Sequence, residues 1–128
     1  MDFSRFADMD VIDGHMHFRH YRRVESLVTM MGAVPYAHIH ALSMPDRERV
    51  NDNPAVLWLK ALCPDRAFIS AGLDYVHTFA DLEHASERLA SQVEMFKSIG
   101  FDGLKMYASA PRSCKWFQVP LGAPEYRV

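Results

Sequence analysis

Strand-like and helix-like segments alternate along this sequence, and that order restricts the fold more than any other feature. Four short stretches rich in apolar and aromatic residues are predicted as strands, at 10–17, 36–43, 67–75 and 101–108. Three stretches between them carry apolar residues at helical spacing, at 21–31, 54–63 and 81–99. The order βαβαβαβ predicts an α/β protein whose parallel strands are joined by right-handed crossovers.

Local signals predict where the helices begin and end. Asn53 followed by Pro54 predicts a helix start, because the asparagine side chain can cap the helix and proline needs no N–H partner at the first helical position. Gly32 and Gly100 are predicted stops of the other two helices. The segment 109–128 has no regular period and is predicted as loop.

Size, charge and cysteine content exclude several classes of protein. A chain of 128 residues, 49% of them hydrophobic, suits one domain, and its net charge of −2 gives no basis for binding nucleic acid or an anionic membrane. No apolar run reaches the roughly 18 residues of a membrane span, and the N-terminus lacks a signal-peptide pattern. Cys63 and Cys114 form no disulfide framework, so we expect a reduced, cytoplasmic protein.

The first predicted strand runs into two histidines, in the sequence Val-Ile-Asp-Gly-His-Met-His at 11–17. Alternate side chains of a strand point the same way, so His15 and His17 share a face about 6.6–7 Å apart along the backbone. Two imidazoles at that spacing can converge on one metal ion, at M–N distances of about 2.0–2.1 Å for zinc. Asp13 has the same parity and could hold an imidazole N–H from behind.

The spacing alone is weak evidence for a metal site. Seven histidines in a chain of this length predict about 0.4 such pairs by chance, and the sequence holds a second pair, His38 and His40. The first pair is distinguished by its context, an apolar strand followed by Asp-Gly at the start of a β/α chain. Ordinary polar histidines at a strand end remain the alternative.

In three segments the sequence resembles the amidohydrolase superfamily, and within it the amidohydrolase-related group. The first is the strand that ends in Asp-Gly-His-Met-His, and the second is Gly-Phe-Asp-Gly-Leu-Lys-Met-Tyr at 100–107, which is similar to the fourth strand of that group. The third, Val-Pro-Leu-Gly-Ala-Pro-Glu-Tyr at 119–126, looks like the loop before its fifth strand. Three matching segments in the right order are more specific than one motif.

This resemblance implies the N-terminal half, strands 1–4, of a (β/α)8 barrel, since a complete barrel needs about 200–250 residues. The expectation is one partial domain over 1–128, truncated after the loop that follows strand four, from a metal-dependent hydrolase of a small substrate. The resemblance implies His15 and His17 as ligands of a divalent ion, with zinc expected, and a general base in the missing half. The isolated chain would then be inactive.

Four other residues are candidates for binding the substrate. Lys105 interrupts an apolar strand and is predicted to face the barrel lumen, where it binds substrate or forms an ion pair. In some branches of the superfamily a lysine on this strand is carboxylated and bridges two metals, a less favoured alternative here. His38 and His40 are expected to line the pocket or to be hydrogen-bonded, and His20 could contact an anionic substrate.

Two alternatives to the hydrolase come from other classes of protein. One is a non-catalytic half barrel that assembles with a copy of itself or a partner, because four parallel strands leave two sheet edges unpaired. The other is a doubly wound receiver-like domain, which would have strand order 2-1-3-4 and helices on both faces of the sheet.

Overall fold

The structure of this chain is a computed structural model, which describes residues 9, 11–18, 21–33, 38–44, 51–106, 119–120 and 122–127. The strands are β1 (Ile12–Phe18), β2 (His38–Ser43), β3 (Ala67–Gly72) and β4 (Gly103–Lys105). The helices are η2 (Tyr21–Arg23), α1 (Val24–Ala33), α2 (Asn53–Leu62), α3 (Tyr75–Phe79), α4 (Ala85–Ser98) and η3 (Pro124–Tyr126).

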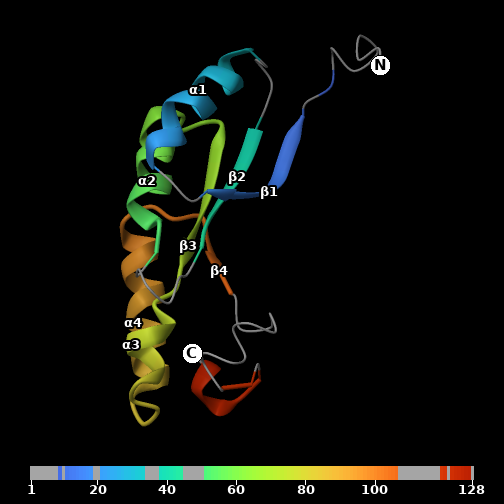
Figure 1. Ribbon diagram of the computed structural model, residues 1–128. Coiled ribbons are helices and arrows are strands. Elements are labelled where there is room, and N and C mark those ends of the chain that lie inside the picture. The colour runs from blue at the N-terminus through green and yellow to red at the C-terminus, as the bar shows by residue number, and fades with distance from the viewer. Residues whose placement is uncertain are drawn as a thin grey trace.

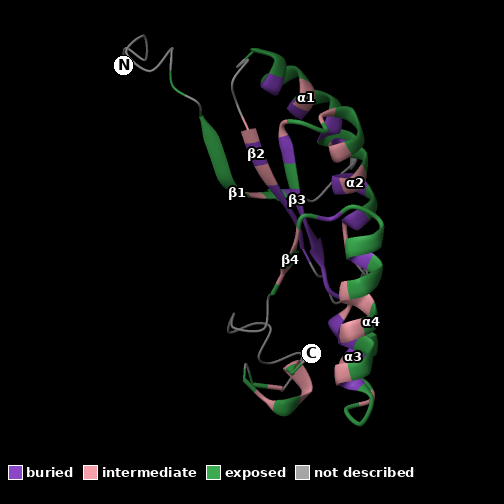
Figure 2. Ribbon diagram, turned by 180° about the vertical axis from the view of Figure 1, so that it is seen from behind, coloured by how far each residue is buried: buried purple, intermediate pink, exposed green. Residues whose placement is uncertain are grey.

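The four strands form one parallel sheet in the order β1-β2-β3-β4. Figures 1 and 2 show helices α1 to α4 along one face of this sheet, and none of these four helices lies on the other face, which we call the helix-free face. The predicted α/β class and parallel strands are confirmed. The order and the one-sided helices contradict a doubly wound arrangement, which needs a crossover in the strand order and helices on both faces.

The core lies between the sheet and its helices. Alternate residues of the central strands, such as Ile39 on β2 and Ile69 on β3, are buried against helix residues such as Val56 and Leu59 of α2. β1 contributes Phe18, which is only 4% exposed. The sheet is therefore apolar on the helix side, as strands covered by helices should be.

The predicted capping role of Asn53 is wrong. Asp52 occupies the N-cap position of α2 without a side-chain cap, and Asn53 lies inside the helix. The Asn53 amide instead pairs with the backbone of Gly72, accepting its N–H at 2.8 Å and donating to its carbonyl at 3.1 Å. The start of α2 is thereby fastened to the end of β3.

Several other boundaries differ from the prediction. Tyr75 begins α3 instead of ending a strand, because Asp74 accepts the backbone N–H of His77 and starts a helix there. The predicted helix at 81–99 begins only at Ala85, and Gly32 lies inside α1. Gly100 follows α4 with φ of 98°, a conformation that glycine adopts without strain, as its predicted role as a stop requires.

Within the described residues, every helix is too short or too polar to span a lipid bilayer.

Candidate functional site

β1 places its two histidines on the helix-free face of the sheet. Phe18 is buried in the core and Met16 packs against it, so these two side chains point toward the helices. Side chains alternate along a strand, and His15 and His17 therefore point the other way. This is the shared orientation that the sequence predicts for the pair.

The two imidazoles converge at their tips. The Nε2 atoms of His15 and His17 are 2.9 Å apart, and the ring centroids are 4.9 Å apart. A hydrogen bond between two neutral rings has this distance. Two nitrogens that bind one zinc ion at the tetrahedral angle, with bonds of about 2.0–2.1 Å, are about 3.3 Å apart, so the two rings would have to separate by about 0.4 Å to hold zinc. The pair can therefore hold a proton or a metal ion with little rearrangement.

Lys105 joins this pair from the opposite edge of the sheet. Its Nζ lies 3.5 Å from Nε2 of His15, although β4 and β1 are the two outer strands. Three strand spacings in a flat sheet would separate the backbones by about 14 Å, and side chains perpendicular to it would stay equally far apart. Curvature of the sheet toward its helix-free face, together with the reach of these two long side chains, accounts for the contact.

Asp13 has a different partner from the one its parity suggests. Its Oδ1 accepts the backbone N–H of His15 at 3.1 Å, within β1 near the register shift between Asp13 and Met16. The carboxylate thus fixes the backbone that carries His15, whereas a bond to an imidazole N–H was expected.

The second histidine pair lies on the neighbouring strand and has separate contacts. His40 Nε2 lies 2.8 Å from Oγ of Ser70 on β3, so His40 is a hydrogen-bonded histidine as expected. His38 Nδ1 is buried and has no hydrogen-bond partner among the described residues. No contact of either histidine with the His15–His17 pair is recorded there. His20 lies outside the described residues.

Gly103 makes room for the His40–Ser70 pair. A Cβ at position 103 would lie 2.9 Å from Ser70 Oγ, closer than side chains tolerate. Gly103 therefore faces the same side of the sheet as Ser70, and Lys105, two residues later on β4, shares that face. This parity independently supports the position of Lys105 on the helix-free face.

The fit to a metal ion is partial. In the described part of the chain, no group of three or more histidine, cysteine, aspartate or glutamate side chains could hold an ion. His15 and His17 supply two imidazole nitrogens, whereas tight zinc sites use three or four protein ligands. The donors suit zinc, and the other ligands would have to be water, substrate or groups beyond the described residues.

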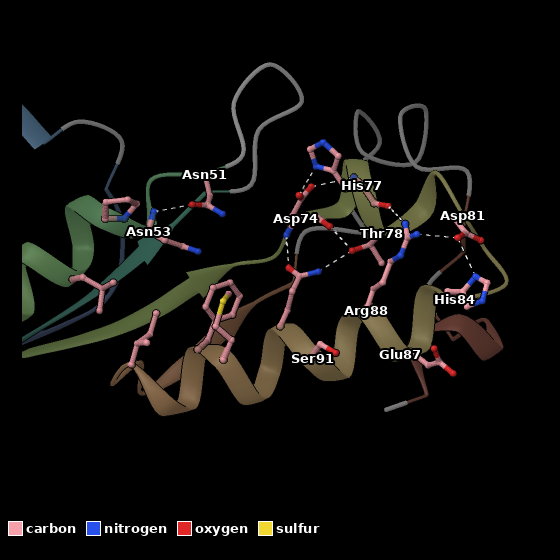
Figure 3. Close-up of a pocket in the computed structure, with 16 residues that line it drawn as sticks. Asn51, Asn53, Asp74, His77, Thr78, Asp81, His84, Glu87, Arg88 and Ser91 are labelled. Carbon is pink, nitrogen blue, oxygen red and sulfur yellow. Dashed lines mark hydrogen bonds and ion pairs between the residues drawn. The ribbon is translucent and has the colours of Figure 1, made fainter.

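A second polar cluster lies on the helix side, where a cavity of about 940 Å³ separates α2 from α4. Figure 3 shows Asp74 and His77 at its rim, and their Oδ2 and Nδ1 atoms are 2.5 Å apart. Gln92 of α4 accepts the backbone N–H of Asp74 and donates to Thr78 Oγ1, both at 2.8 Å. These contacts fasten α3 to α4.

A second aspartate–histidine pair, Asp81 and His84, lines the other end of the cavity and lies seven residues later in the sequence. Asp81 Oδ2 lies 3.0 Å from His84 Nδ1 and 2.9 Å from a guanidinium nitrogen of Arg88. Arg88 also donates to the carbonyl of His77 at 2.7 Å. The hydrogen bond from His84, together with the nearby charge of Arg88, holds the pKa of the Asp81 carboxyl below its ordinary value.

The polar groups of this cavity are mostly engaged with one another. Its apolar wall is formed by Leu57, Met95, Phe96 and Ile99, while Asn53, Gln92 and Arg88 are used in contacts between elements. A ligand site usually presents a few convergent polar groups that are available to the ligand. The helix-free face, where His15, His17 and Lys105 meet, is therefore the stronger candidate.

Sequence reasoning missed Ser70 and Arg88. The partner of His40 lies thirty positions away on the next strand, and no local signal identifies it. The repeated Asp-x-x-His spacing at 74–77 and 81–84 was a usable signal, because an aspartate can bond to a residue three positions later where a turn begins a helix. His77 and His84 each pair with an aspartate.

No family model, curated protein or solved structure matches this chain.

Proposed function

We propose that this chain forms the first four β/α units of a (β/α)8 barrel, and that it belongs to a metal-dependent hydrolase of the amidohydrolase superfamily. The strand order 1-2-3-4, the helices on one face and the contact between the two outer strands support the barrel. The motifs at 11–17 and 100–107 support the superfamily.

The observation that carries the proposal is the meeting of His15, His17 and Lys105 on the helix-free face. Two of these residues come from β1 and one from β4, so only the folded sheet brings them together. His17 lies one residue before the end of β1 and Lys105 ends β4. Barrel enzymes keep their chemistry at this carboxyl end of the strands.

His15 and His17 would hold a divalent ion, with zinc as the expected metal. Such an ion lowers the pKa of a bound water to near 7 and polarises the scissile group. In this chain the two imidazoles would fix the ion, Asp13 would hold the backbone of His15, and Lys105 would face the substrate. The reaction class is cleavage of a C–N or C–O bond, with C–C as an alternative, in a small molecule.

Zinc titration by calorimetry tests the metal site. We expect one weak site per chain, because two protein ligands leave most of the coordination to water. The double variant His15→Ala, His17→Ala should lose zinc binding at least tenfold. The matched control, His77→Ala with His84→Ala, also removes two histidines and should bind zinc as the wild type does.

Equal zinc binding by the wild type and the His15→Ala, His17→Ala variant, with both shown to be folded by circular dichroism, would contradict the proposal. Purified chain loaded with zinc should not hydrolyse ester or lactone probes, because the superfamily places its general base outside these four units. Robust turnover would show that groups within this chain complete the site.

A second function, a half barrel that assembles without catalysis, has one observation in its favour. Among the described residues, β1 and β4 are the outer strands, and both expose apolar side chains: Ile12 at 65% on β1 and Leu104 at 36% on β4, followed by Met106 at 44%. Two copies that paired the edges of these strands would cover them. Zinc binding that depends on His15 and His17 favours the hydrolase over this alternative.

A further inference from the structure

Lys105 is a half-buried cation beside the proposed metal ligands. Its Nζ is 3.5 Å from Nε2 of His15. Other basic groups have carboxylate partners, as Lys60 does with Asp102 and Arg88 with Asp81. Among the ion pairs recorded for the described residues, none includes Lys105.

The ammonium group of Lys105 lies where its charge would weaken the binding of a metal ion to His15 and His17. An ion held by Nε2 of His15 and Nε2 of His17 would lie within a few ångströms of Nζ, where like charges repel strongly even in a partly solvated site. Asp13 is the acidic residue nearest in sequence to the two histidines, and its Oδ1 accepts the backbone N–H of His15. An added anion between Lys105 and the ion would remove the repulsion.

We propose that the site binds a divalent cation and a carboxylate anion as a pair, with Lys105 holding the anion beside the ion at His15 and His17. This inference rests on the proposed metal site, and it adds that tight binding of the metal ion there requires a bound carboxylate. Lysine suits the task because its ammonium is a point charge with three donors on a flexible stem, which can turn from His15 toward the anion. The two ligands then bind cooperatively, and each raises the affinity for the other by the same factor.

Zinc titrations with and without benzoate test this coupling. Benzoate carries one carboxylate and has little affinity for zinc in water. For the wild-type chain, saturating benzoate should raise the zinc affinity by about three- to tenfold. Lys105→Met should bind zinc about tenfold more tightly without benzoate, and benzoate should then change nothing, because the repulsion is already gone.

Two variants keep the result interpretable. Lys105→Arg retains the positive charge and should respond to benzoate as the wild type does. Lys97→Met removes an equal charge in the last turn of α4 and should also behave as the wild type.

The possible results separate the two proposals. Zinc binding that depends on His15 and His17 but is the same in Lys105→Met, with no effect of benzoate, overturns the pairing and leaves the metal site standing. Absence of zinc binding by the wild type at any benzoate concentration overturns both. A benzoate effect that persists in Lys105→Met shows that another group holds the anion and also overturns the pairing.

Discussion

At the scale of single residues, Gly103 shows how a missing side chain shapes the helix-free face. We expect Gly103→Ala to destabilise the fold by about 1–2 kcal/mol, because the added Cβ would lie 2.9 Å from Ser70 Oγ and force that hydroxyl away from His40. Urea unfolding measures the change. Gly14→Ala is the control: nothing lies within 4 Å of a Cβ there, so its stability should stay within about 0.5 kcal/mol of the wild type. Equal effects of the two substitutions would contradict the packing described.

The candidate site was predictable from sequence only in part, and the limit is physical. Alternation along a strand places His15 and His17 on one face, and the structure agrees. The meeting of Lys105 with His15 depends on the curvature of the whole sheet, which no local pattern encodes. The bond between His40 and Ser70 is likewise a property of strand register, which is set between segments far apart in the chain.

At the scale of elements, the turn between α3 and α4 is held by Asp81, His84 and Arg88. Because these contacts lower the pKa of Asp81 from its ordinary value of 3.8, the carboxylate stabilises the folded state at pH values above that value. The contribution should be lost as the pH falls through the lowered pKa. The stability difference between wild type and Asp81→Asn should therefore be largest near pH 5–6 and shrink toward about pH 2.

Thermal unfolding at several pH values measures this difference. Asp65→Asn changes an exposed aspartate outside this network and serves as the control for the loss of one charge. A stability difference for Asp81→Asn that grows as the pH falls would contradict the assigned role of the carboxylate.

Apolar periodicity predicted the four strands and the three longer helices in their order, but it did not predict α3 or η3. Element boundaries were wrong where side chains form bonds between elements. Asn53 resembles a helix cap in the sequence, but the nearby end of β3 offers its amide two bonds with Gly72. Asp74 starts α3 inside a stretch that otherwise resembles a strand, because its carboxylate caps the helix. In both places a polar side chain forms a hydrogen bond that the local sequence pattern did not predict.

At the scale of the whole molecule, the sheet is covered by helices on one face, and its other face carries the histidines and the lysine. Among the described residues, β1 and β4 are the outer strands of the sheet, which is why assembly through their edges is the alternative function. Analytical ultracentrifugation measures the oligomeric state of the chain. A stable dimer that dissociates when Ile12 and Leu104 are replaced by charged residues would favour assembly through these edges. A monomer would favour the hydrolase proposal.

The most direct test of the central claim is anomalous diffraction from a crystal of the zinc-loaded chain. We expect one anomalous peak on the helix-free face, about 2.0–2.1 Å from Nε2 of both His15 and His17. A peak at His77 or His84 with none at His15 and His17, or no peak in crystals grown at saturating zinc, would contradict the account.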